Sequence, residues 1–440
     1  MTEPSLYDQI LDFANRADPW PLYEKLRSQP VWQEADGTFV VSTFREIYAL
    51  QHDPRLSSDL TNLLPEFAAK LPPAQGPGGA PPSFLVSDPP RHDTLRRVAM
   101  RQFGPPHRPD LIDKMAPALK AIVTGLIDNL ADKQGADLVD DVAYPFPVAV
   151  ICHLLGVPPE DEPRFSAWVD PIVNALARPT PEQLQARTDA RQHMSNYLFE
   201  LAQRRRAEPG EDMISGYLTD DGPDGRLEGG DLFSTLMLLL VAGHETTVNL
   251  ITNGWLTLQR HPEVLQRLRT EPGFSIRLVE ELLRYEPSVH ILPFRTAVAD
   301  IAIGDTTIRK GHPIAVMLAS GNRDPEQFPH PDRFDPDRTD TVHLSFATGI
   351  HYCLGAPLAR LEAQFALTQL AKRLRNPRVL ADPPPVPAQS RAARPDPPPD
   401  RLRRSVPCLT IPGVRQSYDV IISGPQAACA RGRAGAAVGR

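Results

Sequence analysis

The chain has 440 residues, 41% of them hydrophobic and 23% charged, a composition that excludes disorder throughout and is typical of a globular protein with a large core. Its formal net charge of −7 argues against a nucleic-acid-binding protein, which usually carries a basic surplus on one face. Four cysteines are too few for a disulfide framework in so long a chain, and no pair has the C-x-x-C spacing of a zinc site.

The first twenty residues carry the acidic side chains Glu3, Asp8, Asp12 and Asp18 and contain no apolar run. We therefore expect neither a signal peptide nor a membrane anchor at this end. The most apolar stretch, residues 236–242, is far too short to span a bilayer. The sequence thus predicts a cytoplasmic protein, which we expect to act as a monomer.

Helical periodicity dominates the pattern of apolar residues, and strand signals are short. The class is therefore mainly α with a small β portion. In chain order we expect a strand at 38–42, a helix directly after Ser87-Asp-Pro-Pro90, helices at 116–131, 181–206, 231–260 and 275–285, strands at 301–303 and 313–317, and a helix at 356–374.

Two regions depart from this globular texture. Residues 71–82 form a long Pro/Gly loop, and long loops in compact domains are commonly lids or binding loops. Residues 381–440 are rich in proline and arginine, a composition that cannot readily pack a core. We therefore expect one catalytic domain over 1–380, followed by an atypical or disordered C-terminal region over 381–440.

Cys353 lies in a Gly-punctuated loop, Leu344-Ser-Phe-Ala-Thr-Gly-Ile-His-Tyr-Cys-Leu-Gly355, which opens directly into the last predicted helix. The glycines permit tight turns and let a flat ligand approach the backbone. Free backbone N–H groups and the positive end of the helix dipole are expected to lower the pKa of this thiol. On these residues alone the cysteine fits a structural, redox-active or metal-ligating role.

The helix at 231–260 is apolar nearly all round, yet its centre reads Ala242-Gly-His-Glu-Thr246-Thr. An acid and hydroxyls in the middle of an apolar helix are costly unless they are partnered or functional. The Ala-Gly pair removes side-chain bulk where a ligand would approach, and threonine hydroxyls bond back to the preceding turn and loosen it. A core helix interrupted by glycine remains the alternative for this segment by itself.

Several motifs together resemble those of the cytochrome P-450 superfamily. The cysteine loop resembles the haem-binding signature F-x-x-G-x-[RH]-x-C-x-G, with Ala347 in place of a common glycine. The helix centre resembles the oxygen-activation motif [AG]-G-x-[DE]-T-[TS]. The E-x-x-R, P-x-R-F and H-x-x-x-R motifs are also matched, and the resemblance covers about residues 18–375. It implies a single triangular, mostly helical domain with the haem between the helix of Thr246 and the helix after Cys353.

The resemblance also implies a role for each matching residue. Cys353 would be the iron ligand of haem b, Thr246 would hydrogen-bond the oxygen being activated, and Glu245 would supply protons through water. Further haem contacts would be Phe346, Gly355, Ala242 and Gly243, and the propionates would meet His92, Arg96, Arg295 and His351. A structural network would join Glu281, Arg284 and Arg333, and substrate would contact Leu238, Val241, His290, Ile291 and Leu292.

The implied reaction is a monooxygenation: one oxygen atom from dioxygen enters a small to medium hydrophobic substrate, such as a secondary metabolite, by hydroxylation or epoxidation. The resemblance to bacterial members implies electrons from NAD(P)H through a ferredoxin reductase and a ferredoxin. Residues 71–82 and 170–181 are candidate lids. The alternatives are a peroxide-driven or oxygen-free haem enzyme, which usually alters the acid-alcohol pair, and a non-catalytic haem-thiolate protein that holds a bound intermediate for other enzymes.

Overall fold

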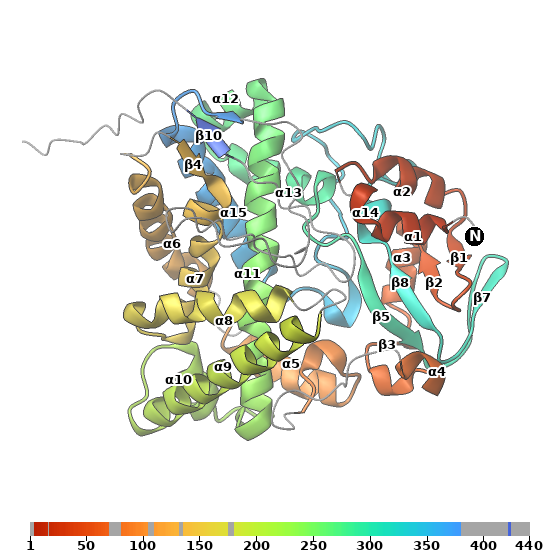
Figure 1. Ribbon diagram of the computed structural model, residues 1–440, viewed down its shortest axis with the longest axis horizontal. Helices are drawn as coiled ribbons and strands as arrows, with labels where there is room; N and C mark the ends of the chain where they lie inside the picture. Colours follow the sequence, from red (N-terminus) through yellow and green to blue (C-terminus); the bar gives the residue numbers. More distant parts are fainter. Residues whose placement is uncertain are drawn as a thin grey trace, which may run out of the picture.

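The computed structural model describes residues 4–15, 17–69, 81–103, 110–131, 135–174, 180–379 and 421–423. A large helical part lies beside a smaller part that contains most of the strands (Figure 1). The fold is mainly α with small sheets, as the sequence predicts, and forms a single domain.

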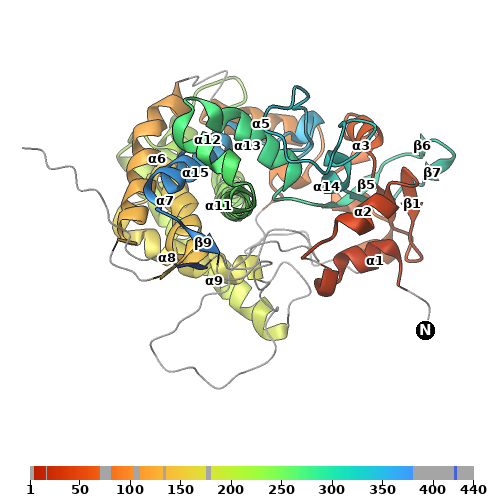
Figure 2. The ribbon, with the colours of Figure 1, turned by 90° about the horizontal axis from the view of Figure 1, so that it is seen from above.

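One long helix, α11 (Gly229–Arg260), runs through the middle of the helical part and is seen end on in Figure 2. It packs against α7, α15, α12 and α13, so most of its circumference is buried. The surrounding helices are α5 (Arg91–Arg101), α6 (Leu111–Asp128), α7 (Pro145–Leu155), α8 (Glu162–Asn174), α9 (Pro181–Ala207), α10 (Met213–Thr219), α12 (Pro262–Thr270), α13 (Phe274–Tyr285) and α15 (Ala356–Arg373).

The main sheet has five strands in the order β1-β2-β8-β5-β3. Its central pair, β2 and β8, is parallel with Phe39 opposite Ile314, and the other pairs are antiparallel. The strands are β1 (Val31–Gln33), β2 (Phe39–Val41), β3 (Leu56–Ser57), β5 (Leu292–Ala297) and β8 (Pro313–Val316). The register of β5 shifts between Leu292 and Arg295, and both of these residues face the cavity described below.

The remaining elements are short. Helices α1 (Leu6–Leu11), α2 (Trp20–Leu26), α3 (Phe44–Gln51), α4 (Pro65–Ala68) and α14 (Leu318–Asn322) surround the main sheet, and β6 (Ile301–Ile303) pairs with β7 (Thr306–Ile308). In the third sheet, β10 (Ile421–Ser423) lies between β4 (Gly135–Asp137) and β9 (Arg378–Val379). The composition of 381–440 gave no signal for β10; the rest of that region lies outside the described residues.

The predicted helices are all present, and local sequence explains their ends. Helix α9 begins with a capping box in which the Thr180 hydroxyl and the Gln183 side chain each accept from the other residue's backbone N–H, satisfying two donors at the helix start. The largest difference is α6, which begins at Leu111 rather than at residue 116 and carries Pro117 within it. The predicted strands at 38–42, 301–303 and 313–317 are β2, β6 and β8.

Among the described helices, α11 alone has the length and hydropathy to cross a membrane. However, 72% of its most apolar window is buried inside the protein. This burial is typical of the core helix of a globular protein.

Candidate active site

A cavity of about 250 Å³ lies between the middle of α11, the loop that carries Cys353, the start of α15 and strand β5. Most of its walls are apolar. The residues predicted to contact a cofactor that line it are Cys353, Phe346, Gly355, Ala242, Gly243, Thr246, Arg96, Arg295 and His351. The fold therefore brings together positions that are up to 259 residues apart in the chain, from Arg96 to Gly355.

The cysteine loop is closed by its own backbone. The N–H of Cys353 donates to the carbonyl of Phe346 at 2.9 Å, and the N–H of Ala359 donates to Gly355 at 2.9 Å where α15 begins. Ala347 has φ 56°, a left-handed conformation that costs a residue with a Cβ about 1–2 kcal/mol. Gly349 has φ 67°, and a Cβ there would lie 2.2 Å from the carbonyl oxygen of Gln51. Glycine at 349 is thus required by contact with α3.

The predicted lowering of the Cys353 pKa is wrong for the protein by itself. Burial raises the pKa of this thiol, and hydrogen bonds from the backbone of Gly355 and Ala356, with the charges of Arg96 and Arg360, oppose that rise without overcoming it. The start of α15 therefore reduces the free-energy cost of ionising Cys353. It does not by itself make the thiolate the more stable form. A metal cation bound to sulfur would supply the missing stabilisation, since a coordinated thiol is deprotonated outright.

The opposite wall of the cavity is the middle of α11. Ala242 and Gly243 are exposed to the cavity, so the helix backbone is accessible at this level. The hydroxyl of Thr246 donates to the carbonyl of Ala242 at 3.0 Å, and that of Thr247 to Gly243 at 3.2 Å. Glu245 is 1% exposed and does not line the cavity. Its position lets it act on the cavity only through an intermediary such as water.

One end of the cavity is cationic. The guanidinium groups of Arg96 and Arg295 and the ring of His351 line it, and the ring of His92 lies 4.5 Å from that of His351, centroid to centroid. Burial lowers the pKa of Arg295 to about 10, partly opposed by the charge of Asp88. Burial, followed by Arg295, His92 and Arg96, lowers the pKa of His351 to about 3. The ring of His351 is therefore neutral near pH 7, and the two guanidinium groups are the charges that favour an anion at this end.

Two buried ring nitrogens are a second reason to expect an anion at this end of the cavity. Among the described residues, His92 Nε2 and His351 Nδ1 have no hydrogen-bond partner, although the other nitrogen of each ring is bonded. Within the described part of the chain, the Arg295 guanidinium likewise makes no hydrogen bond to another residue. Buried polar groups are normally satisfied, so these donors fit carboxylates of a bound molecule. The two propionates of a haem would meet this need.

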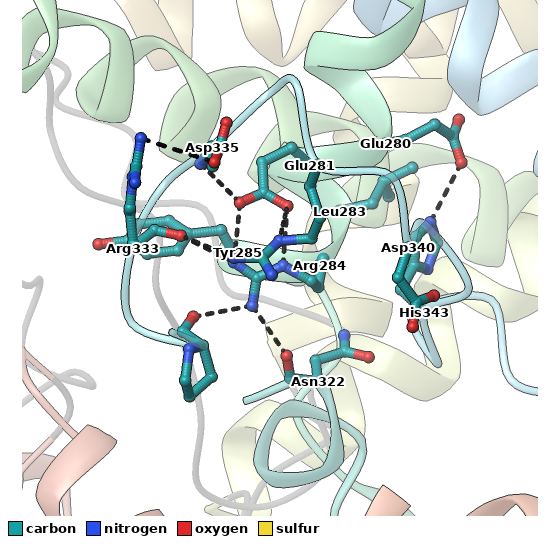
Figure 3. A network of polar contacts seen from close by, with 12 residues as sticks. Glu280, Glu281, Leu283, Arg284, Tyr285, Asn322, Arg333, Asp335, Asp340 and His343 are labelled. Carbon is teal, nitrogen blue, oxygen red and sulfur yellow. Dashed lines mark hydrogen bonds and ion pairs between the residues drawn. The ribbon is translucent and has the colours of Figure 1, made fainter. Parts of the chain in front are cut away.

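The Glu281–Arg284 pair forms the network that the sequence predicts, but its third member is different (Figure 3). Both side chains are at most 3% exposed, and Arg284 donates to both carboxylate oxygens of Glu281 at 2.7 and 2.8 Å. Arg333 contributes its carbonyl, which accepts from Arg284 at 3.1 Å. Its side chain is 71% exposed and pairs weakly with Asp335, because the P-x-R-F segment turns outward. Arg338 Nε, 3.6 Å from Glu281, is the second cation.

A neighbouring ion pair that sequence reasoning missed supports the cysteine loop. Glu280 accepts two hydrogen bonds from Arg360, at 2.6 and 2.9 Å, and one from His343 at 3.3 Å. Arg360 also bonds the hydroxyl of Tyr352 and stacks 4.5 Å from the centre of the Phe346 ring. The only sequence signal was the doubled acid Glu280-Glu281, whose members face different partners.

Two of the five positions predicted to contact substrate lie at the cavity. Leu238 and Leu292 line the cavity. His290 and Ile291 do not: the His290 ring bonds the Tyr23 hydroxyl at 2.9 Å, and Ile291 is buried in the core cluster of Tyr23 and Leu26. Val241 packs on the helical core instead. Ser288 and Val289 line the cavity in their place.

The two candidate lids are only partly covered. Within 71–82 the structure describes only Pro81 and Pro82, and within 170–181 it omits residues 175–179. Residues 71–80 and 175–179 of these two segments lie outside the described residues.

The geometry defines a class of site. One cysteine thiol faces an opened helix across an apolar cavity, and the cationic donors lie at one end. Within the described ranges, no group of three or more His, Cys, Asp and Glu side chains is placed to hold a bare metal ion. A single thiolate suits an iron whose other ligands come from a porphyrin. The residues present therefore fit a thiolate-ligated haem.

Comparisons with known proteins agree. The cytochrome P450 family profile matches residues 81–272 and 276–399, more than half of the chain. The chain is 39% identical to the cytochrome P450 monooxygenase PikC of Streptomyces venezuelae over 82% of this chain and 85% of that protein. It is 35% identical to the 6-deoxyerythronolide B hydroxylase of Saccharopolyspora erythraea, over 81% and 88%. It is also similar to the crystal structure of ligand-free CYP164A2 of Mycobacterium smegmatis, with a TM-score of 0.76, 38% identity and 86% and 94% coverage.

The chain belongs to the cytochrome P450 family and is an oxidoreductase of the monooxygenase class. The family carries haem b, which accounts for the thiol and the cationic end of the cavity.

Proposed function

We propose that this enzyme inserts one oxygen atom from dioxygen, by hydroxylation or epoxidation, into a small to medium hydrophobic product of secondary metabolism. The observation that carries the proposal is that Cys353 and Thr246 face each other across one apolar cavity. An apolar lining with few polar groups suits a hydrophobic ligand. The names of similar proteins, a 6-deoxyerythronolide B hydroxylase among them, support a secondary metabolite as the substrate class.

In this proposal Cys353 is the protein's ligand to the haem iron. Arg96, Arg295 and His351 bind the propionates, with His92 completing the set through its free Nε2. Phe346 and Gly355, which line the cavity near Cys353, would contact the haem, and Ala242 and Gly243 on α11 would leave room for it. The haem, when bound, supplies the activation of dioxygen.

The chain's contribution to the chemistry is proton control. Splitting dioxygen requires protons delivered in order, without flooding the cavity with water. The Thr246 hydroxyl, held by Ala242, is the last donor before the cavity, and buried Glu245 supplies it through water. The apolar remainder of the lining excludes bulk solvent.

Electrons would come from NAD(P)H through a ferredoxin reductase and a ferredoxin, with the enzyme a cytoplasmic monomer whose catalytic domain spans residues 1–380. Ile350 and Tyr352, on either side of His351, are 47% and 41% exposed. The backbone near Cys353 therefore reaches the surface, which suits the approach of a small electron donor.

The test has two stages. A panel of hydrophobic compounds that includes 6-deoxyerythronolide B is screened for a shift of the haem spin state, and each binder is incubated with NAD(P)H, ferredoxin, ferredoxin reductase and 18O-labelled dioxygen. We expect one labelled atom per product molecule. Label-free product formed only with peroxide would favour a peroxide-driven enzyme. Binding without turnover under any electron donor would favour a non-catalytic haem protein.

A further inference from the structure

The haem-facing orientation of His351 depends on a residue outside the cavity. Its Nε2 lies 2.9 Å from the Ser58 hydroxyl, which leaves Nδ1 as the nitrogen without a protein partner. A hydroxyl either donates or accepts, so Ser58 satisfies Nε2 whichever way the ring is protonated. Ser58 is 2% exposed, so no solvent replaces this contact.

Ser58 is in turn held by Asp88. One carboxylate oxygen of Asp88 accepts the backbone N–H of Ser58 at 2.8 Å, and the other accepts the Ser57 hydroxyl at 2.5 Å and the Asn62 amide at 3.4 Å. Asp88 thus fixes the chain directly after β3 in the place that sets the position of the Ser58 hydroxyl. A charged acceptor makes each of these hydrogen bonds stronger than a neutral one would.

Asp88 also meets a second element of the cationic end. Its carbonyl accepts the N–H of His92 at 2.9 Å at the start of α5, the helix that carries Arg96. One residue therefore connects the segment after β3 with α5, and both contribute to the same end of the cavity.

We propose that Asp88 is a positioning residue for the haem propionates: by holding the backbone N–H of Ser58 it places the Ser58 hydroxyl that binds His351 Nε2, which leaves Nδ1 of His351 for a propionate. The inference rests on the proposed haem site. Asp88 itself contacts neither the cavity nor the haem, and it acts only through these neighbours.

The test measures the rate at which the purified holoenzyme loses haem to excess apomyoglobin. Asp88→Asn and Ser58→Ala are expected to accelerate loss by roughly three- to tenfold each, the effect of one lost hydrogen bond to a charged or buried group. The matched control is Asp53→Asn, because Asp53 also accepts a backbone N–H in a turn, that of Arg55 at 2.8 Å, but has no contact with the cationic end. It should lose haem at the wild-type rate.

Two further arms separate positioning from general loosening of the fold. If Asp88 acts through Ser58, the double variant should lose haem about as fast as the faster single variant, whereas independent effects would multiply. Enzyme reconstituted with haem dimethyl ester, which lacks carboxylates, should show no difference between wild type and variants.

Each outcome decides something. Equal rates for Asp88→Asn and Asp53→Asn, multiplied effects in the double variant, or a persisting difference with the dimethyl ester would overturn the role of Asp88. A wild-type enzyme that binds haem normally alongside any of these results leaves the proposed function standing. A wild-type protein that holds no haem would instead remove the proposed function.

Discussion

The hydroxyl of Thr246 donates a hydrogen bond to the carbonyl oxygen of Ala242, 3.0 Å away on the preceding turn of α11. The Ala242 carbonyl is therefore shared between the backbone hydrogen bonds of α11 and the Thr246 side chain, at the level where the helix lines the cavity. The hydroxyl thus lies at the cavity wall, where the proposed function gives it the role of proton relay.

Replacing Thr246 by alanine should preserve the fold and the haem but reduce product formed per NAD(P)H oxidised by about tenfold or more, with the lost electrons appearing as hydrogen peroxide. Thr246→Ser, which keeps the hydroxyl, should retain most of the coupling. Product and peroxide are quantified in the same reaction. Unchanged coupling in the alanine variant would mean that proton delivery does not pass through Thr246.

Arg284 and Arg333 should differ sharply in their effect on stability. Arg284→Ala leaves the buried carboxylate of Glu281 without its bidentate partner and should lower the free energy of unfolding by about 3–5 kcal/mol. Arg333→Ala removes an exposed side chain and should cost no more than about 0.5 kcal/mol, since its carbonyl remains. Urea denaturation of both variants measures this. Similar losses would place the Arg333 side chain back in the network.

Glu280 should make the cysteine loop sensitive to acid. Burial raises its pKa, but hydrogen bonds from His343 and Arg360 outweigh burial and lower the pKa to about 2. An unfolded glutamate titrates near ~4.3, so the pair's contribution is complete above that pH and is lost as the pH falls toward 2. Because Glu280 is partly exposed, we expect the ion pair to contribute only about 1–2 kcal/mol to the free energy of unfolding.

Acid denaturation of the wild type and Glu280→Gln checks this. The variant should be less stable at pH 6 by that amount, and the two curves should converge near pH 2. A constant difference across this pH range would show that Glu280 contributes by packing and not by charge.

The cavity lining can be tested against its neighbours in sequence. Leu238→Phe puts a larger side chain into a cavity of about 250 Å³ and so leaves less room for a ligand. The affinity for a spin-shifting ligand should fall by about tenfold. His290→Ala breaks the bond to the Tyr23 hydroxyl and should cost about 1–3 kcal/mol of stability with ligand affinity unchanged. Ligand titration and urea denaturation of both variants separate the two effects. A large loss of affinity in the histidine variant would put its ring in the cavity.

Local patterns predicted what depends on neighbouring residues in the chain. The helices followed from apolar periodicity, and the roles of the cysteine loop and the Thr246 motif followed from their resemblance to family motifs. The predictions that were wrong concern residues whose direction depends on how the chain turns after a motif ends. Arg333 lies in a segment that turns outward, and His290 and Ile291, just before β5, pack toward Tyr23 and not toward the cavity. No local pattern marks the pairing of Glu280 with Arg360, 80 positions later, or the contact of Ser58 with His351, because both are set by tertiary packing.

The central claim is that Cys353 is the thiolate ligand of a haem in the cavity below α11. Reduction of the purified protein under carbon monoxide tests it directly. We predict a Soret band at the wavelength typical of a thiolate-ligated haem, and its absence in Cys353→Ser. The free, buried Cys152 supplies the control, since Cys152→Ser should keep the band. A folded wild-type protein without bound haem, or a band that survives Cys353→Ser, would contradict the account.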